Sequence, residues 1–322
     1  MKISAFCLTT NAVARKYPFI ESIKSFLPIV DELVVIDGGS TDGTLEAIRS
    51  IGDQKIKIVC DQDTKWEEDW FYSRMSHNFN RGWEECTGDV VFKFDVDWVF
   101  HEERIGGAGN KYNFRTDCEQ MEHRGKCMLK MNRLNHILID RHYIKKETPF
   151  LVFRNNCKQR GFNIKWGLDM ERWGWGNIPI IGKYQENGIW FGYMLDRSDM
   201  DYSCAIIHVY DFSFADQETI RELRYRNYSA IVKQAGMKWR QTAISKPSIS
   251  FENLNGDRGY VFDHWRASIE GMFARPQTQI SLEKHPAIMK EKIKVMTTDM
   301  YGYGAFGWLK EKFSIEKANY FL

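Results

Sequence analysis

Short apolar runs alternate with amphipathic stretches over the first hundred residues. The runs at 3–9, 32–37, 55–60 and 90–95 are apolar and partly β-branched, a pattern that favours buried strands. Helices are expected between them, over 18–28, 44–50 and roughly 67–86. Strands separated by helices predict an α/β fold with a mostly parallel, doubly wound sheet, in which ligands bind at the carboxyl ends of the strands.

The pattern weakens after Phe100. Residues 101–125 are polar and contain Gly106, Gly107 and Gly109, so a loop is expected there. Strands with basic faces are expected over 126–160, a further strand over 205–210 and a helix over 217–234. The sequence beyond about residue 245 predicts helical pieces broken by Pro and Gly.

The composition is that of a globular protein. The chain has 322 residues, of which 43% are hydrophobic and 27% charged, so a disordered or low-complexity protein is excluded and about two domains are expected. The net charge of +2 excludes a polycation, but the charge is uneven. Residues 1–100 hold 11 Lys/Arg against 17 Asp/Glu, whereas residues 111–165 hold 13 against 5.

Cysteine usage favours a reducing compartment. The seven cysteines are odd in number and none has CxxC spacing, which predicts free thiols rather than disulfides or a zinc site. The first residues resemble a signal peptide, but Thr9, Thr10 and Asn11 interrupt the apolar run. No apolar run approaches 18 residues, so no membrane span is expected. We therefore expect a cytoplasmic protein, with peripheral contact to a membrane surface as an option.

Four polar motifs lie at or beside the predicted strand ends. They are Thr9–Thr10–Asn11, residues 37–44 (DGGSTDGT), the stretch from Asn80 through Gly82 to Gly88–Asp89, and Asp95–Val96–Asp97. Together they resemble the donor half of a family-2-type glycosyltransferase with the GT-A fold. The resemblance is good over roughly residues 3–100 and loose over 101–230.

The resemblance implies a nucleotide-diphospho-sugar donor, with a UDP-sugar as the first expectation. The implied donor-binding residues are Thr9, Thr10, Asn11, Asp37, Gly38, Gly39, Ser40, Asp42, Asn80 and Asp95. A departing diphosphate needs its charge neutralised, and two Asp spaced i, i+2 at a strand end can share one divalent ion. We therefore expect Mn²⁺ or Mg²⁺ on Asp95 and Asp97. The family often has Asp where this chain has Gly38, so base recognition would fall on Asp37 or on backbone groups.

A late histidine completes the metal prediction. Some metal-dependent relatives of this fold use such a residue as a further ligand or diphosphate contact, which makes His208 a candidate. A histidine satisfied within the core is the alternative. His101 and Glu102, which follow the acidic motif, are expected to begin a loop or helix.

The catalytic base should come from the acceptor side of the fold. The resemblance implies inversion at the anomeric carbon, in which a carboxylate takes the proton of the attacking hydroxyl. Asp169 and Glu171 lie in a segment flanked by Trp166 and Trp173, and apolar rings would raise a carboxylate pKa and offer a face to a sugar. Surface acids in a packed aromatic loop are the alternative. Rival bases are Asp196, Asp199 and Asp201, although Asp199–Met200–Asp201 is interpreted as a loop.

The sequence therefore predicts a metal-dependent, inverting glycosyltransferase acting on a hydroxyl acceptor. The expected organisation is a donor half (1–100), an acceptor-side half (101–235) and a mainly helical C-terminal extension (236–322). A cell-envelope or surface glycan is the favoured acceptor, and the basic residues of 126–160 suit an anionic one, such as a phosphorylated glycan, a membrane surface or DNA. Alternatives are a phage-type enzyme that glycosylates hydroxymethylated bases of DNA, a sugar-1-phosphate nucleotidyltransferase and an inactive sugar-nucleotide-binding module.

Overall fold

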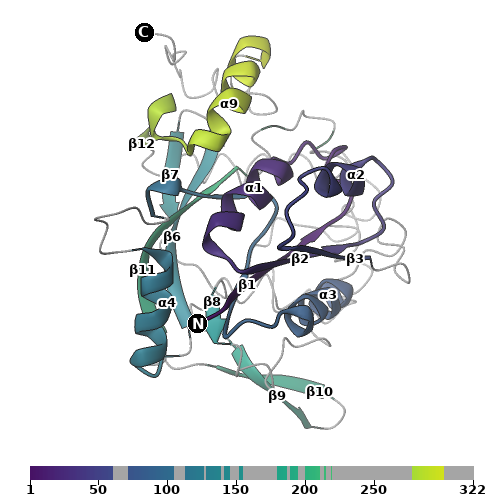
Figure 1. The fold of residues 1–322 in the computed structure, drawn as a ribbon, viewed down its shortest axis with the longest axis vertical. Helices are drawn as coiled ribbons and strands as arrows, with labels where there is room; N and C mark the ends of the chain where they lie inside the picture. Colours follow the sequence, from purple (N-terminus) through teal and green to yellow (C-terminus); the bar gives the residue numbers. More distant parts are fainter. Residues whose placement is uncertain are drawn as a thin grey trace, which may run out of the picture.

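One mixed sheet runs through the described part of the chain (Figure 1). The structure is a computed structural model. It describes residues 1–60, 72–104, 113–126, 128–138, 141–145, 152–154, 180–186, 189–194, 200–210, 214, 219 and 278–300.

The sheet is built around four parallel strands. β1 (Ile3–Thr9) lies between β2 (Glu32–Asp37) and β4 (Val90–Lys93), and β3 (Ile56–Cys60) pairs with the outer edge of β2. Most residues of β1, β2 and β4 are buried, as expected where helices cover both faces of a parallel sheet. The predicted strands and the α/β class are confirmed.

Helices cover both faces of these strands. α1 (Phe19–Phe26) and α2 (Thr44–Arg49) contribute to one core cluster, in which Phe26 stacks on Phe94 with ring centroids 3.9 Å apart. α3 (Tyr72–Glu85) covers the other face, where Phe79 meets Phe6 edge to face. Figure 1 shows α1 and α3 on opposite sides of the β1–β2–β3 region. The doubly wound arrangement predicted from the sequence is therefore present.

Later strands widen the sheet beyond β4. β8 (Val152–Arg154) is antiparallel to both β4 and β6 (Met128–Leu138). β11 (Met200–Val209) is parallel to β6 and antiparallel to β5 (Trp98–Phe100). β7 (Arg141–Lys145) pairs with β6, and β9 (Ile180–Glu186) with β10 (Ile189–Met194) forms a separate hairpin. The strands expected over 126–160 and 205–210 are confirmed.

Parts of two segments expected to be loops form regular structure. A short helix, η2 (Glu102–Arg104), and the longer α4 (Phe114–His123) lie within 101–125. Asn113 caps α4, since its side-chain oxygen accepts from the backbone N–H of Thr116 at 2.8 Å. Met200 and Asp201 begin β11, so the loop expected over 199–201 is also wrong for these two residues.

The C-terminal segment packs on the sheet. It comprises β12 (Thr278–Gln279), which pairs with β7, then η5 (Leu282–Lys284) and α9 (Ala287–Met300). Leu282, Met289 and Ile293 form an apolar cluster with Val99 and Tyr210. The helical character expected here is found in α9, whereas the domain boundary predicted at residue 236 lies outside the described residues. Among the described helices, none has both the length and the apolar character needed to span a bilayer.

Candidate functional site

The predicted donor residues meet because β1 and β2 end side by side. Thr9 is in register with Asp37, and the N–H of Gly38 donates to the carbonyl oxygen of Thr9 at 2.9 Å. β4 pairs with the other edge of β1 and leads into Asp95. The polar motifs after β1, β2 and β4 therefore emerge at one edge of the parallel sheet, where doubly wound folds bind ligands.

Hydrogen bonds join the loop after β1 to the loop after β2. The N–H of Asn11 donates to Ser40 Oγ at 2.9 Å, and the N–H of Thr41 donates to Asn11 Oδ1 at 2.8 Å. Asn11 has a φ of 45°, and Gly39 and Gly43 have φ of 82° and 89°, in the left-handed region that glycine adopts without a Cβ penalty. These hydrogen bonds therefore hold the two loops together as one surface at the ends of β1 and β2.

Asp37 is fully buried beneath this surface. Its Oδ2 accepts from the N–H groups of Gly39 and Ser40 at 3.0 and 2.9 Å, and its Oδ1 accepts from Ser40 Oγ. The carboxylate therefore holds the turn that presents Gly39 and Ser40. Direct contact between Asp37 and a base or ribose stays a prediction.

Asp42 has a similar anchoring role one turn later. Its Oδ2 accepts from the N–H of Ala14 at 2.7 Å, and its Oδ1 accepts from the hydroxyl of Thr44 at 2.6 Å. Partial burial acts to raise the pKa of Asp42, but these hydrogen bonds favour the ionised form and hold the pKa below its ordinary value. The ionised carboxylate thus links the start of α2 to the loop after β1.

Two threonine hydroxyls are buried at this edge. Thr9 and Thr10 are 3% and 2% exposed, and neither Oγ1 has a hydrogen-bond partner among the described residues. A buried hydroxyl without a partner costs free energy that a ligand can recover. Their position at the end of β1 fits a polar ligand lying across the strand ends.

Asp95 and Asp97 lie in the turn between β4 and β5. The N–H of Trp98 donates to the carbonyl oxygen of Asp95 at 3.0 Å, which closes the turn. The side chain of Asp95 is 45% exposed and pairs with Lys93, with Nζ and Oδ1 2.6 Å apart, while Asp97 is half-buried. Two carboxylates of this kind are ligands that Mg²⁺ and Mn²⁺ prefer, so the residues present fit a divalent ion.

The motif from Asn80 to Asp89 contributes to the close packing of the fold. A Cβ on Gly88 would lie 2.6 Å from the backbone nitrogen of Ser4, and one on Gly82 would lie 2.5 Å from the ring of Phe6. Asp89 accepts from the N–H of Lys2 at 2.6 Å. These glycines let α3 and the start of β4 approach β1 closely, and the side chain of Asn80 lies outside the described residues.

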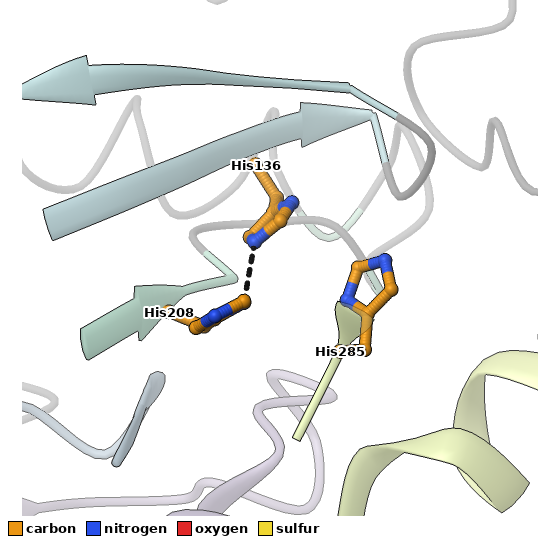
Figure 2. A group of neighbouring side chains, drawn as sticks. All are labelled: His136, His208 and His285. Atoms are coloured by element: carbon orange, nitrogen blue, oxygen red, sulfur yellow. Dashed lines mark hydrogen bonds between the residues drawn. The ribbon is translucent and has the colours of Figure 1, made fainter. Parts of the chain in front are cut away.

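His208 lies with two histidines that the sequence analysis did not single out. His136 on β6, His208 on β11 and His285 before α9 are all buried, and one ring nitrogen from each lies within 4.8 Å of the others (Figure 2). Within the described part of the chain, no such group of three includes Asp95 or Asp97. The role predicted for His208 beside Asp95 and Asp97 stays a prediction.

The expected catalytic bases lie largely outside the described residues. This holds for Asp169, Glu171, Asp196 and Asp199. Asp201 is described, and its carboxylate pairs with Arg124, with Oδ2 and Nη1 2.8 Å apart. Among the basic residues of 126–160, Arg133 lies over the ring of Trp98 at 5.0 Å and so contributes to packing.

Comparison with known proteins gives a match to one family model. Residues 9–160 match the model of glycosyl transferase family 2. These residues, somewhat less than half of the chain, are similar to glycosyl transferase family 2. The matched segment begins at the end of β1 and ends after β8, so it contains all four motifs at or beside the strand ends, and its α/β sheet is of the GT-A type.

Solved structures give weaker likenesses. S. aureus TarS is 12% identical with a TM-score of 0.37, covering 75% of this chain and 41% of TarS. S. aureus TarS 1-349 in complex with UDP is 14% identical with a TM-score of 0.38, covering 91% and 78%. Glucosyl-3-phosphoglycerate synthase from Mycobacterium tuberculosis, in complex with Mn²⁺, UDP and glucosyl-3-phosphoglycerate, is 20% identical with a TM-score of 0.28, covering 41% and 44%. This chain thus spans less than half of the TarS chain and of the synthase. No curated protein sequence matches it significantly.

Proposed function

We propose that this protein transfers a sugar from a nucleotide-diphosphate donor to a hydroxyl acceptor. The observation that carries the proposal is the meeting of three polar segments at one edge of the sheet. Thr9 and Thr10 end β1, the Asp37–Thr44 turn follows β2, and the Asp95–Asp97 turn follows β4. The match to the family 2 model supports the same activity.

The donor would lie across the ends of β1 and β2. The buried hydroxyls of Thr9 and Thr10 are suited to hydrogen-bond its ribose or base. Gly38 and Gly39 have no Cβ, so a flat ring could lie close to the backbone there. Asp37 and Asp42 would act indirectly, because their carboxylates hold the loops that would contact the donor. A uridine base is the first expectation.

Asp95 and Asp97 would hold Mn²⁺ or Mg²⁺ together with the donor diphosphate. The bound ion would neutralise the charge that develops on the departing nucleoside diphosphate. Lys93 orients the carboxylate of Asp95 through their 2.6 Å pair, and Lys93 itself lies over the rings of Phe79 and Trp98 at 4.7 and 5.1 Å.

The acceptor hydroxyl needs a base, and Asp169 or Glu171 fills that role in the proposal. Attack from the face opposite the nucleotide would invert the anomeric carbon. The acceptor is an envelope or surface glycan. β6, β7 and β8 carry many of the basic residues of 126–160, and they adjoin β4 on the side away from β2 and β3. An anionic glycan suits that position.

A nucleotide-sugar screen tests the donor. The melting temperature of the protein is measured with UDP-, GDP-, dTDP- and CDP-sugars, each with Mn²⁺ and with EDTA. A donor that binds only the folded state should raise the melting temperature, and more so with Mn²⁺. Release of free sugar from the stabilising donor then separates an active enzyme from a binding module. If no nucleotide sugar shifts the melting temperature under either condition, the proposal is wrong.

A further inference from the structure

Three buried histidines cluster where β6 and β11 meet the C-terminal segment. We call His136, His208 and His285 the histidine triad; they are 2%, 1% and 0% exposed. They come from β6, from β11 and from the segment between η5 and α9 (Figure 2). Buried histidines from three distant segments seldom meet without a reason, because each imidazole must lose its hydration.

The ring nitrogens are close to the spacing that a metal ion requires. Tetrahedral Zn²⁺ binds histidine nitrogen at about 2.0–2.1 Å, which places two ligand nitrogens about 3.3 Å apart. His136 Nε2 and His208 Nδ1 are already 3.0 Å apart, and all three ligand atoms lie within 4.8 Å of one another. The third nitrogen therefore needs to move by at most about 1.5 Å, which a tilt of one ring provides.

The neighbours of the triad orient its rings. Tyr210 Oη lies 2.8 Å from His285 Nδ1, and the ring of Tyr210 stacks on that of His136 with centroids 4.8 Å apart. The ring of His101 lies 5.1 Å from that of His208, and its Nε2 lies 3.3 Å from the carbonyl oxygen of Lys284. Hydrogen-bonded partners of this kind hold metal-binding imidazoles in position.

An apolar cluster lies beside the triad. Val99, Leu282, Met289 and Ile293 form this cluster with Tyr210, the residue that contacts His136 and His285. Three imidazole nitrogens suit Zn²⁺ rather than Mg²⁺ or Mn²⁺, which prefer oxygen. The ion at Asp95 and Asp97 would therefore differ in kind from one at the triad.

We propose that the histidine triad binds one Zn²⁺ that fastens the C-terminal segment 278–300 to the sheet. The hydrogen that one of His136 and His208 now donates to the other would move to the second nitrogen of its own ring, which gives each ring a lone pair for the ion. The C-terminal segment already docks through other contacts: Glu102 accepts from the N–H of Ala287 at 2.8 Å, and Lys292 pairs with Glu21 at 3.1 Å. The ion would add bonds from His285 of this segment to His136 of β6 and His208 of β11.

Metal binding to the full-length protein tests the proposal without measuring sugar transfer. The protein is stripped with a chelator, incubated with Zn²⁺ and desalted, and bound zinc is measured by mass spectrometry. We expect one Zn²⁺ per chain in the wild type and in Asp97→Asn, and none retained in His285→Gln. His123→Gln is the matched control, since this histidine is exposed on α4 and should retain one ion. Asp97→Asn separates the triad ion from the donor ion of the proposed function.

Two readouts on the wild type need no variant. Co²⁺ substitution should give the intense visible absorption of a four-coordinate site, and zinc X-ray absorption should show nitrogen ligands with imidazole scattering. Retention of less than about 0.2 Zn²⁺ per chain without such absorption would mean that the triad is a hydrogen-bonded stack only. Equal zinc retention by a folded His285→Gln would place the ion elsewhere. Either outcome overturns the proposal.

Discussion

The backbone N–H of Tyr210 donates to the carbonyl oxygen of Asp97, with nitrogen and oxygen 3.0 Å apart. The same tyrosine meets His285 through its hydroxyl at 2.8 Å. One residue at the end of β11 therefore touches both the acidic turn after β4 and the segment that precedes α9. The position of the acidic turn depends in this way on residues more than a hundred positions later in the chain.

Asp97→Ala should abolish sugar transfer and the metal-dependent part of donor binding. The fold should remain, because the half-buried side chain contributes little to the core and the carbonyl bonded to Tyr210 is kept. Calorimetric titration with the nucleoside diphosphate, with and without Mn²⁺, measures the effect. Glu46→Gln is the control, since its side chain is 73% exposed on α2. If Mn²⁺ enhances binding equally in Asp97→Ala and in the wild type, Asp97 is not a ligand.

Asp169→Asn should lower kcat by at least about 100-fold while donor affinity stays near normal. General-base catalysis contributes roughly 10²–10⁴-fold, and the amide cannot accept the proton of the acceptor hydroxyl. Steady-state kinetics on Asp169→Asn, Glu171→Gln and Asp196→Asn identify the base. An active Asp169→Asn beside an inactive Glu171→Gln or Asp196→Asn would move the role to that residue.

Neutralising Lys145, Lys146 and Lys158 should raise the acceptor KM and leave the donor KM unchanged. These residues belong to the basic sequence segment 126–160, in which Lys145 ends β7, whereas the donor contacts are proposed at the ends of β1, β2 and β4. Acceptor binding should also weaken with salt, in proportion to the number of charges contacted. A shallow salt dependence indicates a sparsely charged glycan and a steep one a polyanion. An acceptor KM that responds neither to salt nor to the substitutions would show that this segment is only a solvated surface.

Gly88→Ala should destabilise the fold by about 2 kcal/mol or more, because the new Cβ would lie 2.6 Å from a backbone nitrogen of β1 that cannot move aside. Gly52→Ala provides the comparison. Its Cβ would meet nothing within 4 Å, although its φ of 69° costs about 1 kcal/mol for a non-glycine residue. Urea unfolding of both variants measures the difference. Equal losses would mean that close packing at Gly88 is unimportant.

Glu32→Gln should flatten the acid dependence of stability. Partial burial acts to raise the pKa of Glu32, but hydrogen bonds from the Ser4 hydroxyl and from Thr87 outweigh it and lower the pKa below 4.5. Because the folded pKa lies below the unfolded one, this stabilisation is present above about pH 4.5 and is lost as the pH falls through the folded pKa.

Urea unfolding at about pH 6 and at about pH 3.5 measures this loss, which should be about 1 kcal/mol for a partly exposed carboxylate in the wild type. The variant should lose less over the same interval, whereas Glu46→Gln should behave as the wild type. A variant with the full acid sensitivity of the wild type would show that other carboxylates set it.

The fold of the first hundred residues was predictable, where it is described, because its signals are local. The strands 3–9 and 32–37 are found at the predicted residues, since a buried parallel strand is a short apolar run. Helix α4 was missed because Gly106, Gly107 and Gly109 dominated the interpretation of 101–125. Its own signal was present, with Asn113 as a cap and Phe114, Cys118 and Met121 buried on one face.

The histidine triad was not predictable in the same way. Its members are 72 and 77 residues apart in sequence, and no spacing rule connects positions that only the sheet brings together. His208 could be proposed from the family resemblance, whereas His136 and His285 could not. Similarly, β12 is two residues long, and its pairing with β7 depends on tertiary structure alone.

The pairing of β11 with β5 and β6 sets the limits of any fragment of this protein. The family match ends at residue 160, yet β11 supplies hydrogen bonds along β6 from Met128 to Asn135 and along all of β5. A fragment cut at 160 would leave the backbone groups of both strands unpaired, and open strand edges promote association between chains. The segment that matches the family model is therefore shorter than the segment needed to pair the strands of the sheet.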